Sequence, residues 1–189
     1  MRVPRQFIIE GVDRMGKSTL IEGLLQELGY HLVVHYDKPK RLTAYNFYEA
    51  FEGGSLLAYQ NALYYNMFCI INSGARVIFD RGHLGEVVYA PMYRSYDGEY
   101  VFDCEHGADT GDTRLVLLTT SDFSFIKDDG LSLDFSKKEE EQAAFVKAFD
   151  RSSIKDKVQV DVSNGRGGYK KPDEILAEVL KTSVLPSQK

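Results

Sequence analysis

The sequence predicts an α/β fold in which a five-stranded parallel sheet is covered by helices on both faces. Short apolar segments alternate along the chain with longer segments of helical character. Strands buried on both faces of a parallel sheet are almost wholly apolar, as "FIIE" and "ARVIFD" are. The chain shows no internal repeat, low-complexity tract or linker, so residues 1–189 are expected to form a single domain.

Each element follows from its length, its periodicity and the turn residues beside it. The expected strands are residues 7–10, 31–35, 75–80, 113–120 and 157–162. The expected helices are residues 17–28, 42–51, 55–72, 82–93, 143–149 and 173–181. The polar, Gly-rich residues 94–112 are expected to form an irregular connection.

The overall charge restricts the partners of this protein. The 189 residues carry a formal net charge of −5, so no general positive field attracts long nucleic acid or an anionic membrane. No apolar segment is long enough to span a bilayer, and the two cysteines are expected to be free thiols. We therefore expect a cytoplasmic protein that binds small nucleotides through a local cluster of basic groups.

The segment "GVDRMGKST", residues 11–19, has the spacing of a phosphate-binding loop. It follows an apolar strand and leads into a helix, so the N–H groups of the loop and of the helix N-terminus point at the same place. Lys17 would reach the β- and γ-phosphates of a nucleotide, and the Ser18 hydroxyl would ligate Mg²⁺. The residues expected to bind the phosphates of ATP are Gly11, Met15, Gly16, Lys17, Ser18 and Thr19.

The longer string "EGVDRMGKST" resembles the P-loop of thymidylate kinases, in the form that carries Asp-Arg inside the loop. The resemblance implies the three-layer fold of P-loop NTPases, with ATP as phosphate donor and Mg²⁺ as cofactor. It also implies that Asp13 faces the acceptor nucleotide and that Arg14 reaches the phosphates between which transfer occurs. Phosphoryl transfer depends on positioning and charge neutralisation, which an arginine in the loop supplies.

A second motif, "FDRGHLGEVVY", is similar to the Asp-Arg motif of the same family. Carried over, Asp80 would lie near Mg²⁺, Arg81 would bind the acceptor phosphate, and Tyr89 would wall off the sugar 2′ position. The sequence departs from the family at Gly82, where an aromatic residue is usual, and at Gly85-Glu86, where Ser-Gly is usual. In this second motif, the sequence looks more like nucleotide kinases encoded by bacterial viruses than like a housekeeping enzyme. The residues that the resemblance makes catalytic are Asp13, Arg14, Lys17 and Arg81.

A third segment, "DKPKR", follows the second expected strand. Its Pro39 and Arg41 match a Pro-x-Arg of the family, whose arginine also holds the acceptor phosphate. A solvated basic turn is an equal alternative. Asp37, at the start of the segment, is expected near the acceptor, where a nucleoside kinase would carry a general base.

The base of the acceptor is expected beside the helix over residues 55–72. At the family's base-contacting positions the sequence has Leu56 and Gln60, without the usual stacking Phe and base-reading Arg. Gln60 offers a donor and an acceptor together and can read a base edge, with Tyr64 as a neighbouring aromatic. Most other aromatic side chains of this helix are expected to be core.

Three further features belong to the expected architecture. Residues 122–142 lie where the family has its mobile lid, with Lys127 as the notable base among many acids. Arg166, in the turn "SNGRGG" after the fifth strand, could stack on the adenine of ATP. The apolar stretch 62–71 would allow the homodimer that is usual in the family.

The motifs together favour a nucleoside monophosphate kinase acting on a deoxynucleotide, and the resemblance favours dTMP. An acceptor phosphate is already anionic, so this reaction needs no general base. Three alternatives stay open: a deoxynucleoside kinase with Asp37 as base, a polynucleotide 5′-kinase and a regulatory nucleotide-binding protein. Nucleoside kinases of this fold rely on an arginine-rich lid, which residues 122–142 lack. A regulatory switch would need neither Arg41 nor Arg81.

Overall fold

The computed structural model describes residues 3–29, 31–36, 55–128 and 134–181. Its centre is a five-stranded parallel sheet, which confirms the predicted α/β class. The strands are β1 Gln6–Glu10, β2 Leu32–His35, β3 Val77–Asp80, β4 Thr113–Thr119 and β5 Asp156–Asp161. They lie side by side in the order β2-β3-β1-β4-β5.

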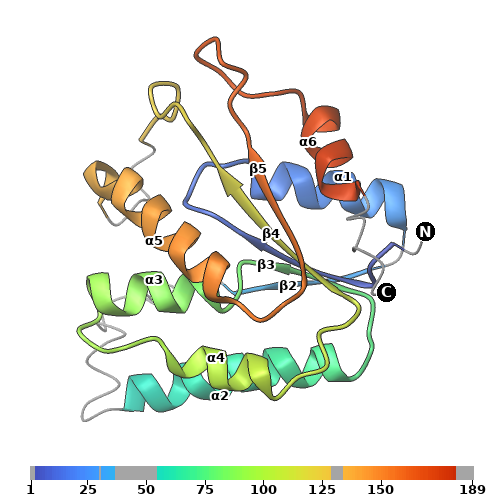
Figure 1. Ribbon diagram of the computed structural model, residues 1–189, viewed down its shortest axis with the longest axis vertical. Helices are drawn as coiled ribbons and strands as arrows, with labels where there is room; N and C mark the ends of the chain where they lie inside the picture. Colours follow the sequence, from blue (N-terminus) through green and yellow to red (C-terminus); the bar gives the residue numbers. More distant parts are fainter. Residues whose placement is uncertain (1–2, 30, 37–54, 129–133, 182–189) are drawn as a thin grey trace, which may run out of the picture.

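Helices cover both faces of this sheet, as predicted. They are α1 Lys17–Leu28, α2 Ser55–Asn72, α3 Leu84–Tyr93, α4 Tyr100–His106, α5 Lys138–Arg151 and α6 Pro172–Leu180, and a 3₁₀ turn, η2, spans Phe135–Lys137. In Figure 1, α1 and α6 pack together on one side of the sheet, and α2 to α5 lie on the other side. In the described part of the chain, no helix is both long enough and apolar enough to cross a bilayer.

Two boundaries differ from those predicted. Residues 94–112 are not wholly irregular, because α4 forms inside them and buries Val101, Phe102 and Glu105 on the side that packs near α2. Polar neighbours conceal this short buried face in the sequence. Helix α5 begins before residue 143, because the charged run "KKEEE" supplies its first turn, where three glutamates complement the positive end of the helix dipole. The helix predicted over 42–51 lies outside the described residues.

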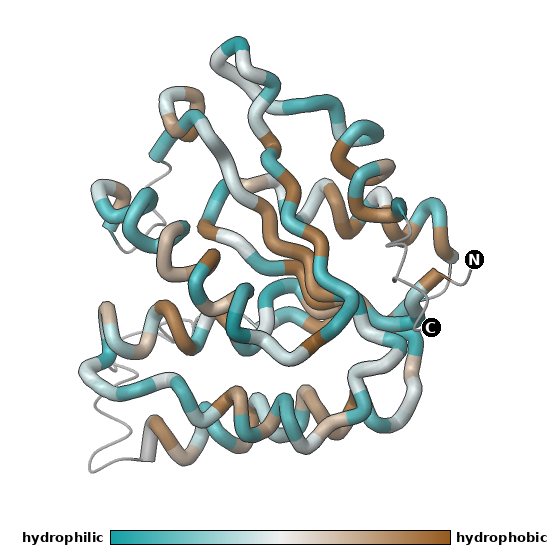
Figure 2. The backbone as a smooth tube through the Cα atoms, viewed as in Figure 1, coloured by the Kyte–Doolittle hydropathy of each residue, from teal (hydrophilic) through white to brown (hydrophobic). Residues whose placement is uncertain are grey.

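The hydrophobic core lies where the helices meet the central strands (Figure 2). Every residue of β1 and of β4 is buried, as expected for central strands covered on both faces. From α2, Met67, Phe68 and Ile71 join this core, whereas Tyr65 on the same helix is exposed. One side of the stretch expected to form a dimer face is thus used by packing within the domain while the other side is exposed, and the dimer stays a prediction.

The parallel register brings the carboxyl ends of three strands to one edge of the sheet. Asp80 pairs with Ile9 of β1 and with His35 of β2, so the P-loop starts beside the ends of β2 and β3. Gly11 opens this loop with φ 136, and a Cβ there would lie 2.5 Å from the carbonyl oxygen of Leu118. Only glycine therefore lets the chain leave β1 so close to β4.

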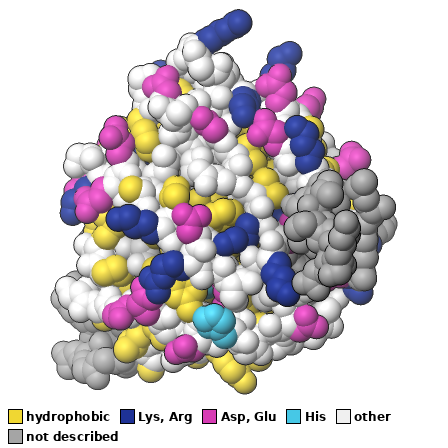
Figure 3. All heavy atoms as spheres, in the orientation of Figure 1, with side chains coloured by type: hydrophobic (Ala, Val, Ile, Leu, Met, Phe, Trp, Pro, Cys, Tyr) yellow, Lys and Arg dark blue, Asp and Glu magenta, His cyan; other side chains and the backbone are white. Residues whose placement is uncertain are grey.

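Charged side chains of both signs are mixed on the surface. On the face in Figure 3, Lys and Arg side chains alternate with Asp and Glu side chains. This mixture agrees with the formal net charge of −5. Binding of phosphate groups must then depend on a local arrangement of cations rather than on a general field.

Candidate active site

The P-loop holds the ammonium group of Lys17 inside its own curve. Lys17 Nζ donates hydrogen bonds to the carbonyl oxygens of Gly11, at 2.9 Å, and Val12, at 2.8 Å. Burial, and after it the positive charge of Arg81, lowers the pKa of Lys17 to about 8. A nearby anion would favour the charged ammonium, so the electrostatics of the loop suit a phosphate ligand.

Two arginines beside this loop have a left-handed backbone. Arg14, within the P-loop, has φ 73, and Arg81, directly after β3, has φ 69. Residues other than glycine rarely adopt this conformation, and such strain is concentrated at functional sites. Met15, next to Arg14, is fully buried and anchors the loop in the core. Packing thus maintains a backbone geometry that places both arginines at the sheet edge.

A cavity of about 680 Å³ beside the P-loop forms what we name the donor cavity. Its lining joins the P-loop to the start of α1, the end of β3 and the segments that follow β4 and β5. Phe125 and Tyr169 meet edge to face in its wall, with ring centroids 4.6 Å apart. Its polar and charged lining residues are Arg14, Lys17, Ser18, Thr19, Asp80, Arg81, Lys127, Tyr169 and Lys170.

The structure separates the predicted adenine contact from this cavity. Arg166 is exposed and does not line it, whereas Tyr169, three residues further on, does. The Tyr169 hydroxyl donates a hydrogen bond to the carbonyl oxygen of Arg14 at 2.5 Å, which ties the turn after β5 to the P-loop. Tyr169 is not among the residues predicted from the sequence, although its place at the end of a Gly-rich turn is a usable signal.

The two predicted Mg²⁺ ligands, Ser18 and Asp80, both line the donor cavity. A hydroxyl and a carboxylate supply hard oxygen ligands, and Mg²⁺ in kinase sites is held by one or two such groups together with substrate phosphates. These residues therefore fit the cofactor. The His35 Nδ1 atom lies 2.8 Å from Asp80 Oδ2 and is a further, unpredicted neighbour. Within the described residues, no cluster of three or more His, Cys, Asp or Glu could hold a metal ion alone.

A second cavity, of about 360 Å³, lies next to the first and is named here the acceptor cavity. The described residues that were predicted to bind the acceptor all line it: Asp13, Gln60, Tyr64, Arg81 and Tyr89. Arg81 also lines the donor cavity, so this one side chain borders both spaces. Asp37 and Arg41 lie outside the described residues.

Cations converge on Asp13 at the boundary between the two cavities. Arg81 Nη2 donates a hydrogen bond to Asp13 Oδ1 at 2.9 Å. Lys138 Nζ, from the first turn of α5, lies 3.9 Å from Asp13 Oδ2 and 2.8 Å from Glu141 Oε2. Lys138 is buried, although it comes from a run of charged residues that reads as a solvated surface. Its ammonium lines neither cavity but supports Asp13 from behind, a contact that the sequence does not reveal.

The segment predicted as a lid is described on either side of residues 129–133. Lys127 lines the donor cavity, and its carbonyl oxygen lies 3.5 Å from Arg14 Nε. Residues from Lys138 onward belong to α5, so the loop itself is shorter than the predicted range of 122–142. The lid region therefore contributes Lys127 to the donor cavity and Lys138 to the boundary.

Glu10, the last residue of β1, is a buried carboxylate that lines the acceptor cavity. Its Oε1 atom accepts hydrogen bonds from the backbone N–H groups of Leu84, at 2.9 Å, and Gly85, at 3.4 Å. These are orphan donors of the first turn of α3, which the carboxylate satisfies. Burial raises the pKa of Glu10. This residue was not predicted, although a carboxylate that ends a buried strand is a signal for it.

The glycine that departs from the thymidylate kinase pattern has a steric reason here. A Cβ at Gly82 would lie 2.6 Å from Ile8 Cγ2 and 3.1 Å from Glu10 Oε1. Any side chain larger than glycine at this position would therefore have to move the side chain of Ile8, which packs against it.

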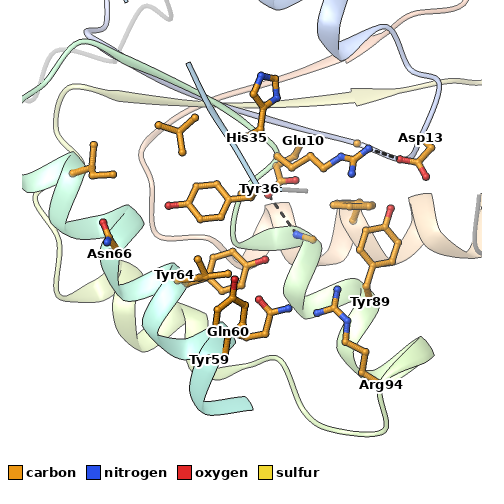
Figure 4. Close-up of a pocket in the computed structure, with 18 residues that line it drawn as sticks. Glu10, Asp13, His35, Tyr36, Tyr59, Gln60, Tyr64, Asn66, Tyr89 and Arg94 are labelled. Atoms are coloured by element: carbon orange, nitrogen blue, oxygen red, sulfur yellow. Dashed lines mark hydrogen bonds and ion pairs between the residues drawn. The ribbon is translucent and has the colours of Figure 1, made fainter. Parts of the chain in front are cut away.

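The end of the acceptor cavity away from Asp13 has aromatic walls and a polar floor (Figure 4). Tyr36 stacks on Tyr64, with ring centroids 5.8 Å apart, whereas Tyr89 forms the wall on the side of Asp13. Gln60 is buried, and its amide lies on the same side of the cavity as the guanidinium of Arg94. Arg94, which follows α3, is not among the residues predicted from the sequence. Apolar walls with a few convergent polar groups are typical of a site for a small molecule.

No protein-family model and no curated protein matches the sequence. Solved structures do share its fold. The YorR protein of Bacillus subtilis, solved in complex with phosphorylated GDP, aligns over 92% of both chains with a TM-score of 0.59 and 20% identity. The thymidylate kinase of Ehrlichia chaffeensis aligns over 92% of this chain and 95% of its own, with a TM-score of 0.59 and 15% identity.

A second thymidylate kinase, from Candida albicans, aligns over 94% of this chain and 89% of its own, with a TM-score of 0.54 and 18% identity. These likenesses show that the chain has the three-layer fold of the P-loop kinases. The resemblance to thymidylate kinases, inferred from two short motifs, is thereby confirmed at the level of the fold.

Proposed function

We propose that this protein is a nucleoside monophosphate kinase that transfers the γ-phosphate of ATP to a deoxynucleoside monophosphate, with dTMP among its acceptors. The observation that carries the proposal is the place of Arg81, which borders both the donor and the acceptor cavity. A kinase must bring two phosphate groups together at one point, and a guanidinium can neutralise both.

The donor cavity supplies the ATP side of this reaction. The N–H groups of the P-loop and of the first turn of α1 bind the phosphates, and Lys17 and Arg14 add positive charge. Ser18 and Asp80 would hold Mg²⁺, which neutralises charge on the transferred phosphate when bound. Tyr169 and Phe125 offer aromatic faces for the adenine.

The acceptor cavity supplies the second nucleotide. Arg81 binds the acceptor phosphate and is itself positioned by Asp13, 2.9 Å away. Lys138 lies near the other oxygen of Asp13 and supports this carboxylate from behind. Tyr89, in the wall, limits the space beside the sugar. Because the attacking phosphate oxygen is already anionic, no side chain has to remove a proton.

The first experiment is an ADP-release assay with Mg·ATP and a panel of deoxynucleosides and their monophosphates. We expect turnover with monophosphates only, and a fall of about 10²-fold or more in kcat/KM for Arg81→Ala, because a charge contact to the reacting phosphate is lost. Arg76→Ala is the matched control, since Arg76 is exposed and precedes the same strand, β3.

The outcomes separate the alternatives. Turnover of unphosphorylated nucleosides that is abolished by Asp37→Asn would replace the proposal by a deoxynucleoside kinase. Turnover of oligonucleotide 5′ ends alone would indicate a polynucleotide kinase. Nucleotide binding without turnover of any acceptor would support a regulatory protein.

A further inference from the structure

The polar floor of the acceptor cavity is organised by a buried carboxylate that the phosphate chemistry does not use. Glu86, on α3, is completely buried. Its two oxygens accept hydrogen bonds from Arg94 Nη1 and from the hydroxyls of Tyr96 and Tyr100, the last at 3.0 Å. A buried carboxylate needs such compensation, and a guanidinium with two hydroxyls provides it.

This arrangement gives Arg94 a fixed orientation. Burial opposes its charge, but the carboxylate of Glu86 raises the pKa of Arg94 above its ordinary value, so the guanidinium stays charged. The loop that carries Tyr96 is pressed against α3, because a Cβ at Gly98 would lie 2.5 Å from the carbonyl oxygen of Glu86. Arg94 is thus held by its Nη1 edge, and its Nε and Nη2 atoms bind no residue that the structure describes.

A second polar group faces the same space. Gln60 is 5% exposed and lines the acceptor cavity, yet its amide has no hydrogen-bond partner among the described residues. Figure 4 shows this amide and the guanidinium of Arg94 turned toward one another across the lower part of the cavity. An amide that faces a cavity and has no partner within the protein is available to bond a polar group of a ligand there.

The two side chains differ in what they can recognise. The Gln60 amide carries a donor and an acceptor, and rotation of the amide exchanges them, so it can pair with a keto or an amino base. Arg94 carries donors only. Guanine and thymine present a carbonyl oxygen where adenine and cytosine present an amino group. A fixed guanidinium donates a hydrogen bond to the carbonyl oxygen, whereas it meets only another donor in the amino group.

We propose that Arg94, oriented by Glu86, Tyr96 and Tyr100, makes this a subsite for keto bases, which accepts guanine nucleotides as well as thymine nucleotides and rejects adenine and cytosine. The inference rests on the proposed function, because it names the base of the acceptor in the same cavity. It widens the acceptor class beyond a thymine nucleotide. Glu86, Tyr96 and Tyr100 act as positioning residues, and Arg94 and Gln60 contact the base.

The test compares nucleotides that differ in the keto or amino group of the base. dIMP with dAMP is the purine pair, and dUMP with dCMP is the pyrimidine pair. We expect kcat/KM to favour the keto member of each pair by about 10- to 100-fold, the size of one arginine contact to a base edge. Equal rates within both pairs, or a preference for the amino members, would overturn the proposal.

The matched variants locate the preference in Arg94. Arg94→Met alone leaves a buried, uncompensated Glu86 and is expected to be unstable. The double variant Glu86→Gln with Arg94→Met removes both charges, so the protein should stay folded. Its kcat/KM should then be about equal for the keto and the amino member of each pair. Arg151→Met is the control, because Arg151 pairs with Glu99 on the surface and lines neither cavity. A double variant that folds and keeps the full preference would refute the role of Arg94.

Direct binding separates this inference from the proposed function. Calorimetric titration with each of the four monophosphates, in the absence of ATP, measures the keto preference without any turnover. Tighter binding of dIMP and dUMP with no phosphorylation would support the base subsite and overturn the kinase. Phosphorylation of all four at equal rates with equal affinities would support the kinase and overturn the base subsite.

Discussion

The donor and acceptor cavities are built in different ways. The donor cavity takes four of its nine polar and charged lining residues from one continuous segment, the P-loop with the first turn of α1, and the others from three further segments. The acceptor cavity is lined by residues of β1, β2, α2, α3 and α5 and of the loops between them, and α2 supplies six of these residues. A site that is continuous in sequence depends on local backbone geometry, whereas a dispersed site depends on how the helices pack.

The buried polar contacts show the same contrast. In the P-loop, Lys17 bonds carbonyl oxygens five and six positions away in the chain. In the acceptor cavity, Glu10 bonds residues 74 and 75 positions away, and around the start of α3 Glu105 bonds His83 and Ser152, 22 and 47 positions away. The acceptor side is therefore expected to be the more sensitive to changes in global stability.

The largest expected effect lies on the donor side. Lys17→Met should lower kcat by about 10²- to 10³-fold, because a preorganised cation at the transferred phosphate is lost. Since the loop is a local structure, the melting temperature should change little. The ADP-release assay and a thermal melt measure the two quantities, with Lys155→Met, at an exposed position, as the control. A variant with near-normal kcat would remove Lys17 from the mechanism.

The next effect concerns the contacts that support α3. Burial alone would raise the pKa of Glu105, but hydrogen bonds from His83, Ser153 and Ser152 dominate and lower it to about 2. Because the folded pKa lies below the ordinary value of 4.5, the stabilisation is complete above that value and is lost as pH falls toward about 2. The shift corresponds to about 3 kcal/mol of unfolding free energy.

Glu105→Gln measures this contribution. Urea unfolding at a series of pH values should show wild-type stability falling from about pH 5 to pH 2 more steeply than that of the variant. At neutral pH the variant should raise KM for the acceptor more than KM for ATP, since His83 directly precedes α3. Parallel stability curves for the two proteins would show that Glu105 is not the group that titrates.

The smallest expected effect shows whether Tyr169 or Arg166 contacts the adenine of ATP. Tyr169→Leu should raise KM for ATP about tenfold, the effect of losing one aromatic stacking contact to a base. Arg166→Ala should stay within about twofold of wild type, because Arg166 is exposed and outside the donor cavity. A larger increase in KM for ATP in Arg166→Ala than in Tyr169→Leu would show that Arg166 is the adenine contact and that Tyr169 is not.

Prediction from sequence succeeded where a pattern is local. The alternation of apolar strands and helices predicted the sheet, and the segment with Gly11, Gly16, Lys17 and Ser18 forms the predicted turn between β1 and α1, while its binding of phosphate stays a prediction. Asp13, Arg81 and Tyr89 came from motifs carried by one strand end and the helix that follows it. The boundary errors, at α4 and at the start of α5, both arose where charged residues surround a buried helix face.

Glu10, Lys138, Arg94 and Tyr169 escaped prediction for a common reason. Glu10, Lys138 and Tyr169 each bond a residue more than 70 positions away, and Arg94 depends on how the loop after α3 folds back onto Glu86. Lys138 reads as part of a solvated charged run, yet its ammonium is buried beside Asp13, 125 positions earlier. Arg94 reads as a surface residue after a helix, yet Glu86 and two tyrosines turn it into the acceptor cavity.

The amino-acid sequence was enough to predict the fold class and the turn between β1 and α1, because backbone conformation and burial of apolar strands depend on neighbouring residues. That Arg81 borders two cavities, that Glu10 caps α3, and that Arg94 and Gln60 face one space could be learned from the folded chain alone. Those relations follow from the register of parallel strands and from the packing of α2, α3 and α5 against one another and the sheet. Packing joins residues far apart in the chain, and the physical chemistry of a site acts between atoms that are close in space.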